Sequence, residues 1–269
     1  MKIIPRIYFI LLASIALIPF SAIAASSTQL SAGMDYLFLK HENYDENSFV
    51  LNTESGWIPG VQLTMSTMSS RWQGQATLEA YKGEISYQEQ MSDKVSNSVV
   101  QQDLTRLSYR LEKFNSQKAY RFYGLILFQS WDRNSQSNAD IIGRNNKYRW
   151  VTLEGGFHYD LYKTKHHELN IEFGASRTLF SKALMDKTNE GLGKPLVSLN
   201  DKFGFSQKFS YRYILNRKSG IELLMQTRYW QFSSSDVKRV TVGNTTTDVS
   251  EPESQSLSFS LGATYFYQF

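Results

Sequence analysis

The residues best suited to chemistry in this sequence of 269 residues are its four histidines, because the chain contains no cysteine. Without cysteine, a disulfide framework, a thiolate nucleophile and a cysteine-based metal site are all excluded. Imidazole and carboxylate groups remain, and these serve in general acid–base catalysis and in metal binding. The sequence also has no glycine-rich phosphate-binding motif.

The histidine positions favour structural roles over catalysis. His166 and His167 are adjacent in a basic segment, which is typical of a solvated turn. A metal site built on this pair would need a third ligand, and the sequence places none nearby. His158 lies two residues before Asp160, a spacing that points both side chains to one face of a strand. We therefore expect His158 and Asp160 to belong to a polar network.

Strands must position these side chains, because apolar and polar residues alternate along most of the chain. The clearest case is residues 254–269, where apolar residues fall on every second position. The predicted strands are residues 30–40, 56–66, 71–82, 101–112, 119–131, 148–161, 168–178, 202–215, 220–232 and 254–269. The predicted long connections are residues 41–55, 84–99, 132–147, 179–201 and 233–253.

Long and short connections alternate strictly, so that both ends of the domain lie on the side of the short turns. This pattern predicts an all-β, antiparallel, up-and-down transmembrane β-barrel of about ten strands. Strands of roughly 10 to 14 residues fit the tilted crossing of a bilayer. A soluble β-sandwich would more often mix its loop lengths. The 14% aromatic content also suits lipid-facing strands with aromatic girdles.

The first residues predict export. Lys2 and Arg6 precede an apolar run at residues 7–20, and small residues follow it. This order is typical of a secretory signal peptide. We expect cleavage after Ala24, with Ala25 as the near alternative. Residues 1–24 would then be the signal peptide, and residues 25–269 the barrel.

The closing segment carries a family resemblance. Tyr265, Tyr267 and Phe269 occupy alternate positions at its end. This resembles the closing strand of Gram-negative outer-membrane β-barrels, in which a terminal Phe follows aromatic or apolar residues at every second position. The resemblance implies location in the outer membrane and recognition by the barrel-assembly machinery. It also implies contact with outer-membrane lipids and lipopolysaccharide. No subfamily is identified.

If the apolar face meets lipid, the other face lines the lumen and carries charges of both signs. The inward-facing charged residues are Glu79, Arg106, Arg110, Glu154, Glu172, Lys208, Arg212, Glu222 and Arg228. Arg106, Glu154, Glu172 and Lys208 fall near mid-height, and we expect them to pair with one another. A barrel of this size has a narrow interior. Side chains stay ionised in such an interior when they pair with the opposite charge. We expect a self-neutralised lumen; a narrow polar pore is the alternative.

Five tryptophans mark the ends of the predicted strands. Trp131, Trp150 and Trp230 take the inward parity near the long loops, where they would form an aromatic shelf at the mouth. We favour the alternative, in which a bulge near each strand end turns them outward into the interfacial girdle. Trp57 and Trp72 take the outward parity and are expected in that girdle.

The sequence thus predicts a non-enzymatic outer-membrane barrel without cofactor or metal, with a structural or interaction role and an unknown surface partner. The net charge is only +4 and acidic and basic residues are interspersed, which argues against a nucleic-acid-binding surface. His41 begins the first predicted outer loop and precedes three acids, Glu42, Asp45 and Glu46. That position invites comparison with the omptin proteases, ten-stranded barrels with acidic and histidine residues at the outer rim. Their paired-Asp and Asp–His signatures are not recognisable here. A narrow channel and a rim-located hydrolase are the alternatives.

Overall fold

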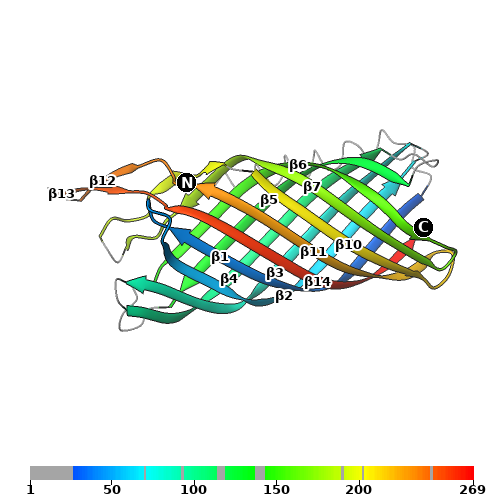
Figure 1. Ribbon diagram of the computed structural model, residues 1–269, viewed down its shortest axis with the longest axis horizontal. Coiled ribbons are helices and arrows are strands. Elements are labelled where there is room, and N and C mark those ends of the chain that lie inside the picture. Colours follow the sequence, from blue (N-terminus) through cyan, green and yellow to red (C-terminus); the bar gives the residue numbers. More distant parts are fainter. Residues whose placement is uncertain are drawn as a thin grey trace.

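Ten long antiparallel strands form a closed barrel in the computed structural model of the chain (Figure 1). The structure describes residues 27–69, 71–91, 94–113, 119–136, 143–188, 191–201, 203–242 and 245–269. The long strands are β1 (Ser27–Tyr44), β2 (Val50–Met68), β3 (Trp72–Met91), β4 (Lys94–Lys113), β5 (Tyr120–Ser135), β6 (Asn145–Lys163), β7 (His167–Leu184), β10 (Phe203–Ile214), β11 (Ser219–Ser233) and β14 (Glu253–Gln268). The predicted all-β, ten-stranded barrel is confirmed. The predicted signal peptide and its cleavage site lie outside the described residues.

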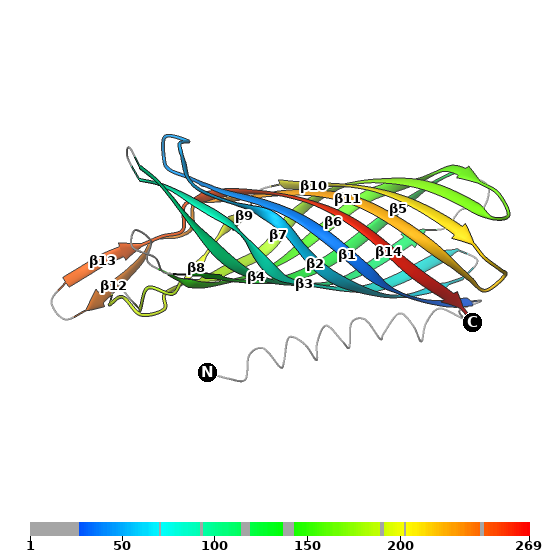
Figure 2. The same cartoon turned by 90° about the horizontal axis from the view of Figure 1, so that it is seen from below.

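Four short strands occupy the long connections. β8 (Leu196–Ser198) pairs with the end of β7, and β9 (Asn200–Asp201) pairs with the end of β11. β12 (Lys238–Val242) and β13 (Thr245–Val249) form a separate hairpin that projects from one end of the barrel (Figure 2). Among the described residues, no helix has the length and apolar character needed to cross a membrane.

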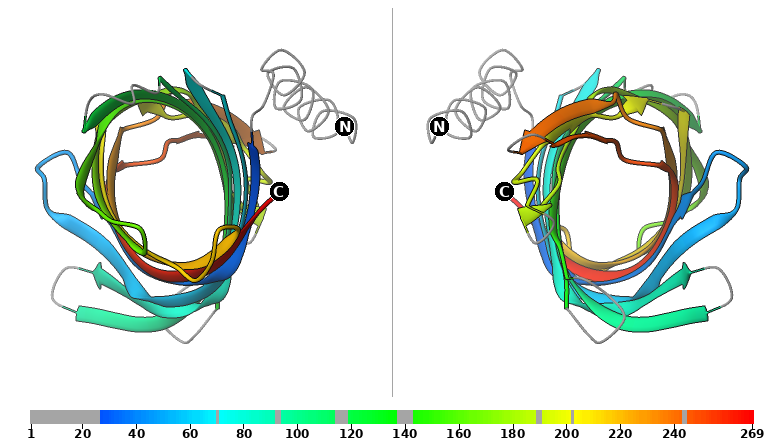
Figure 3. Two further views of the ribbon diagram at one scale, coloured as in Figure 1. Left: turned by 90° about the vertical axis from the view of Figure 1, so that its right-hand side faces the viewer. Right: turned by 90° about the vertical axis from the view of Figure 1, so that its left-hand side faces the viewer.

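The two ends of the barrel differ in the length of their connections. β1 closes the ring by pairing with β14, and seen end-on the strands form a continuous wall (Figure 3). The backbone N–H of Phe269 donates to the carbonyl oxygen of Thr28 at 2.9 Å, so the start of β1 and the end of β14 meet at one end. This end carries the short turns and is called the short-turn end. The opposite end is called the long-loop end.

The strands run further at the long-loop end than the sequence predicts. The prediction of residues 84–99 as a long connection is wrong, because β3 and β4 stay paired through them as far as Met91 and Lys94. β1 and β2 likewise extend into predicted loop 41–55 and leave only residues 45–49 between them. Both extensions were missed from the sequence for one reason: the apolar and polar faces of these strands exchange sides along the strand.

Each extended strand exchanges its apolar and polar faces along its length. We call the part of the barrel nearer the short-turn end lower, and the part nearer the long-loop end upper. In the lower part of β1, Met34 points outward and is 77% exposed, whereas Asp35 points inward and is buried. Further along the same strand, Leu37 and Leu39 are buried on the inward face, while Lys40 lies on the outward one. The lower part has the pattern of a membrane barrel, and the upper part has that of a water-soluble β-barrel.

The exchange occurs at one level around the barrel. Leu104 of β4 is paired with Trp131 of β5, which is paired in turn with Tyr148 of β6, and all three are buried. On the outward face of β5, the apolar residue Phe128 is followed by Asp132. Since neighbouring strands change at matching heights, the boundary forms a ring.

The outward apolar residues form a belt below this ring. Trp57 and Trp72 lie outward as predicted, 42% and 39% exposed. Trp57 packs on Tyr36 and Phe38, whose ring centroids lie 5.6 and 5.4 Å from the ring centroid of Trp57. The backbone N–H of Ser69 donates to the carbonyl oxygen of Trp72, so Trp72 lies level with Ser69 at the end of β2. Trp57 lies on the same strand about twelve residues before Ser69, and this length separates the levels of the two tryptophans. At about 3.3 Å per residue and a tilt of about 40°, the belt is about 30 Å high, the thickness of a hydrocarbon core.

From the upper edge of the belt upward, an apolar cluster fills the interior; we call it the plug. Side chains from β1 to β8, β11 and β13, and from the ends of the adjoining segments, contribute to it. Its buried members are Leu37, Leu39, Ile58, Tyr81, Ile85, Leu104, Trp131, Tyr148, Trp150, Ala183, Met185, Val197, Leu199, Trp230, Phe232 and Val249. The plug replaces the polar lining that the lower lumen has.

Candidate functional site

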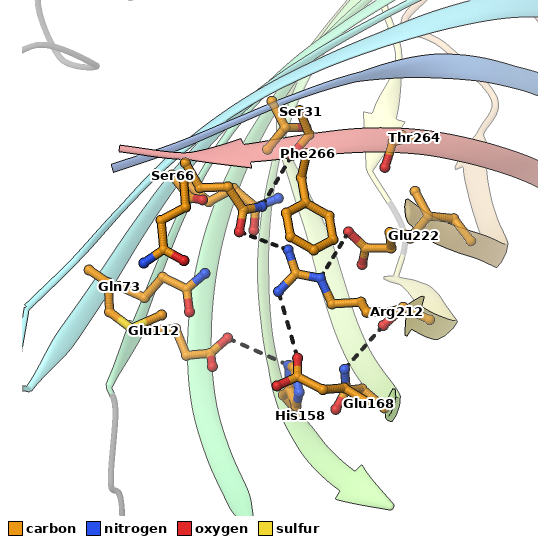
Figure 4. Close-up of a pocket in the computed structure, with 18 of the residues that line it drawn as sticks. Ser31, Ser66, Gln73, Glu112, His158, Glu168, Arg212, Glu222, Thr264 and Phe266 are labelled. Atoms are coloured by element: carbon orange, nitrogen blue, oxygen red, sulfur yellow. Dashed lines mark hydrogen bonds and ion pairs between the residues drawn. The ribbon is translucent and has the colours of Figure 1, made fainter. Parts of the chain in front are cut away.

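Below the plug, the lumen is lined mainly by charged and hydrogen-bonding side chains, with one small buried cluster of Tyr123, Leu125 and Leu127 on β5. A cavity of about 340 Å³ lies at the short-turn end, and all ten long strands contribute residues to its lining (Figure 4). We call it the short-turn cavity. A second cavity of about 60 Å³ lies next to it toward the middle of the lumen and shares Arg110, Glu172 and Lys208 with it.

Arg110 is the centre of the charged lining. Its Nη1 donates to Glu172 Oε2 at 2.5 Å, and its Nη2 donates to Glu112. The guanidinium carbon also lies 3.9 Å from the ring centroid of Tyr123. His158 Nδ1 lies 3.3 Å from the other oxygen of Glu172. Two carboxylates and an aromatic face therefore compensate the buried guanidinium.

A second guanidinium completes this cluster. Arg121 Nε lies 3.2 Å from Glu112 Oε1, and its Nη2 donates to Asp160. His158 Nε2 lies 3.0 Å from Asp160 Oδ1, so this pair belongs to a polar network as the sequence predicts. β4, β5, β6 and β7 all contribute, which means that the cluster ties four consecutive strands together.

The four residues expected to pair with one another at mid-height do not form one network. Only Lys208 and Glu172 meet, and Arg106 and Glu154 have other partners. Lys208 Nζ lies 3.8 Å from Glu172 Oε1, so these two do meet. Arg106 does not reach Glu172: it lies 3.7 Å from Glu79 and donates from Nε to Gln129 at 2.9 Å. These two partners come from the strands adjacent to β4, and Arg106 Nη2 also donates to Ser258 Oγ on β14 at 3.5 Å.

Glu154 pairs with a base that was not among the expected four. Its Oε2 lies 3.6 Å from Arg228 Nη1. Its Oε1 accepts hydrogen bonds from Tyr123 and from Ser206, each at 2.9 Å. The single network expected from the sequence is therefore distributed over several positions around the wall.

The two remaining predicted charges meet at the short-turn cavity. Arg212 Nε lies 3.5 Å from Glu222 Oε2, and Arg212 Nη1 lies 3.8 Å from Glu168 Oε2. Its guanidinium lies over the ring of Phe266 at 4.4 Å and donates to Gln29 at 2.9 Å (Figure 4). Arg212 thus joins β10 to β1, β7, β11 and β14.

Several members of the charged lining were missed from the sequence. Glu112 has the same parity as Arg110, so the alternation alone could have found it. Arg121 lies in a segment that is apolar on both faces, where parity is ambiguous. Outside this lining, the buried ion pair between Arg133 and Glu54 above the plug was also missed, because both residues lie in segments predicted as loops.

The three inward tryptophans are buried in the plug. Trp131 and Trp150 are each 2% exposed and Trp230 is 9% exposed, so the favoured girdle interpretation is wrong for them. The ring centroids of Trp131 and Trp150 are 6.4 Å apart, and those of Trp150 and Trp230 are 6.3 Å apart. Tightly packed and covered, they close the interior instead of forming an open shelf.

The other histidines do not assemble a catalytic or metal centre within the described parts of the chain. His41 is buried, packs edge-on against Trp131 at 5.0 Å, and has Ser256 Oγ 2.8 Å from its Nδ1. His166 lies in an exposed turn at the short-turn end, and the half-buried His167 begins β7 directly after it. No group of three or more His, Asp or Glu side chains suited to a metal ion is found among these residues.

No protein-family model matches the sequence, and no curated protein matches it. Among solved structures, the chain is similar to the outer membrane protease OmpT from Escherichia coli, with a TM-score of 0.59 and 10% identity over 91% of this chain and 98% of that one. The fold is that of a Gram-negative outer-membrane β-barrel. This fold and the apolar belt together place the chain in the outer membrane. At this identity the similarity concerns the fold and not the activity.

Two other outer-membrane proteins align less closely. The translocator domain of autotransporter NalP from Neisseria meningitidis has a TM-score of 0.45 and 9% identity, over 97% of this chain and 96% of that one. The toluene transporter TodX from Pseudomonas putida has a TM-score of 0.42 and 9% identity, over 91% of this chain and 90% of that one.

Proposed function

We propose that this protein is a non-enzymatic outer-membrane barrel with a sealed lumen, whose long loops face the cell surface and have a structural or binding role. Its belt would contact outer-membrane lipids, its outer surface would contact lipopolysaccharide, and the barrel-assembly machinery would insert it. The plug is the observation that carries this proposal. It lies between the two lower cavities and a third cavity of about 390 Å³ at the long-loop end.

An apolar plug opposes ion passage for a physical reason. An ion that leaves water needs replacement ligands, and packed apolar side chains supply none. Leu39, Ile58 and Trp150 are at most 2% exposed, so no hydrated path passes beside them. The charges below the plug are paired across strands, which supports a bracing role for them.

The surroundings of the histidines support a non-enzymatic role. His41 is only 3% exposed and its neighbours are Ser256 and Trp131, so a substrate would not reach it without displacing the plug. A narrow channel remains the second candidate, because polar cavities lie on both sides of the plug and its displacement would join them.

Conductance in planar bilayers tests the sealed barrel. The folded, unaltered protein is expected to insert without producing current steps, and steady single-channel current would contradict the proposal in favour of a channel. Turnover of peptide and lipid substrates by the same preparation tests the enzymatic alternative. Turnover that is lost in a folded His41→Ala variant would favour a hydrolase.

A further inference from the structure

The connections at the two ends of the barrel differ in the sign of their charged side chains. The four short connections, residues 69–71, 114–119, 164–166 and 215–218, contain no Asp or Glu in the sequence. Their charged residues are Arg71, Lys118, Lys165, Arg217 and Lys218. The long connections contain acids as well as bases, and Asp45, Glu46 and Glu251 lie in them. The rim of the short-turn end is therefore positively charged, although the whole chain is nearly balanced.

The bases at the short-turn end are exposed, and most have no partner within the described part of the chain. We call them the basic rim, which consists of Arg71, Lys113, Lys163, Lys165, Arg217 and Lys218. Lys163 bonds to Glu168 at 2.8 Å, and Lys218 Nζ lies 6.0 Å from the ring centroid of Tyr267. The side chains of the other four form no hydrogen bond or ion pair with the residues described. These charges are available to a ligand.

The basic rim lies at the lower edge of the belt. Lys113 on β4 is paired with Trp72 on β3, the tryptophan that marks this edge, and Arg71 directly precedes Trp72. Further round the wall, Lys218 lies against Tyr267, whose side chain is 39% exposed. Aromatic rings of this kind occupy the headgroup level of a membrane, and the long side chains of Lys and Arg extend into the headgroups. The bases are thus placed at the height of lipid phosphates.

The layout of the basic rim identifies the class of ligand. Its members come from the β2–β3, β6–β7 and β10–β11 connections and from the ends of β4 and β6, so they follow the circumference of the barrel. A compact soluble anion would meet only one or two of them. A layer of phosphate groups around the wall would meet them all, and anionic headgroups attract Lys and Arg at a membrane surface.

We propose that the short-turn end binds anionic phospholipid headgroups of the inner leaflet through the basic rim. A zwitterionic phospholipid fits less well, because its own ammonium group opposes the bases. The proposal rests on the proposed function in one respect: the short-turn end must face the periplasm, where the inner leaflet of the outer membrane lies.

Quenching of Trp72 fluorescence by brominated lipids tests the proposal at one part of the rim. The full-length Trp57→Phe barrel leaves Trp72 as the lipid-facing tryptophan, because Trp131, Trp150 and Trp230 are buried in the plug. In phosphatidylcholine bilayers, the bromine is carried either by phosphatidylcholine or by a minor share of phosphatidylglycerol. We expect phosphatidylglycerol to associate beside Trp72 about threefold more strongly than phosphatidylcholine at low salt, and this preference should fall as salt is added.

Two double variants in the Trp57→Phe background separate the rim from the overall charge of the barrel. Arg71→Gln with Lys113→Gln removes the two bases beside Trp72 and should abolish the preference. Lys40→Gln with Lys82→Gln is the matched control, because it removes the same charge from outward-facing bases at the upper edge of the belt. It should leave the preference unchanged. Heat-modifiable migration on gels establishes folding. If the first double variant does not fold, Lys113→Gln alone replaces it and should still reduce the preference.

Three outcomes would overturn the phospholipid site: equal association of the two lipids beside Trp72, a preference that survives loss of Arg71 and Lys113, or an equal loss in the control. Poly-glutamate tests a soluble anionic partner. Its saturable binding to the barrel in detergent, without any lipid preference in bilayers, would assign the basic rim to such a partner instead. Failure here in a non-conducting barrel leaves the proposed function intact, whereas current steps or a tag at Lys165 labelled on intact cells would count against the proposed function itself.

Discussion

Asp35 and Leu37 stand two residues apart on the inward face of β1, and the interior changes from polar to apolar between them. Asp35 accepts a hydrogen bond of 2.5 Å from Tyr81, and Leu37 is 1% exposed within the plug. The outward face changes in the opposite sense a few residues further on, at Lys40. The barrel is therefore closed by apolar packing at one level and braced by ion pairs at another.

Truncating the plug should weaken the barrel and open it. Trp150→Ala removes a side chain that is 2% exposed, and a loss of about 3–5 kcal/mol in the free energy of unfolding is expected. Urea titration in detergent measures this loss. Replacing Trp131 and Trp150 together should in addition produce current steps in planar bilayers. Trp57→Ala, which alters a lipid-facing tryptophan, should leave the bilayers silent. Silent bilayers with the folded double variant would place the seal elsewhere.

Glu172 should couple strongly to Arg110 and weakly to Lys208. Its contact with Arg110 is 2.5 Å and hydrogen-bonded, whereas Lys208 lies 3.8 Å away. Glu172→Gln should cost about 3–5 kcal/mol if the site is dry, because a buried guanidinium loses one of its carboxylates. Double-mutant cycles with Arg110→Met and with Lys208→Met, read from unfolding in detergent, compare the two couplings. Additive effects of the Glu172 and Arg110 changes would contradict the assigned pair.

The turn after β7 should lose stability in acid. Hydrogen bonds from Lys194 and Thr188 lower the pKa of Asp186 from 3.8 to about 2. Since the folded pKa is depressed, the stabilisation is complete above about pH 4 and is lost as the pH falls through 2. NMR titration of the Asp186 carboxyl tests the value. Local protease resistance should follow the same pH range and become independent of pH in Asp186→Asn. A midpoint near 4 would mean that these hydrogen bonds do not persist in solution.

The orientation of the barrel is tested with epitope tags. A tag at Gly191, in a long connection, should be labelled on intact cells, and a tag at Lys165, in a short turn, should not. Permeabilised cells provide the control, in which both tags should be labelled. Labelling of the Lys165 tag on intact cells would reverse the orientation.

The closing strand should be required for assembly. Phe269 points outward at 65% exposure, and its N–H bonds to Thr28 at the seam between β14 and β1. Deleting Phe269, or Phe269→Asp, should lower the amount of heat-modifiable protein in outer-membrane fractions. Phe122→Asp alters another exposed aromatic residue away from the seam, and it serves to separate loss of the closing signal from a general cost of charge in the belt. Equal losses in both variants would remove the reason to treat Phe269 as a signal.

The sequence predicts the belt well and the region above it poorly, for a reason visible in β3. Apolar residues alternate outward from Trp72 to Ala80, which gives a clear period of two. Beyond Lys82 the alternation continues with its faces exchanged, so Ile85 points inward and the segment resembles a polar loop. The parity of the three inward tryptophans correctly predicted that they point into the barrel. The bulges expected to turn them outward do not do so.

The partners of the lumen charges could not be obtained in the same way. Arg110 on β4 contacts Glu172 on β7, three strands away along the wall. Such a contact depends on the radius of the barrel and on the length of a guanidinium side chain. Parity and height give neither quantity, so they correctly placed Glu154 and Arg106 inside but not their partners.

The exchange of strand faces also sets how deep the barrel sits and how far it projects. Sinking toward the bilayer would bring Lys40, Asp103 and Asp132 into hydrocarbon, and rising would expose the belt to water, so both movements are opposed. From Lys82 to its tip, the β3–β4 hairpin continues for about nine residues, or about 20 Å along the barrel axis at about 3.3 Å per residue. The last described pair of this hairpin, Met91 and Lys94, is thus held well clear of the lipid surface.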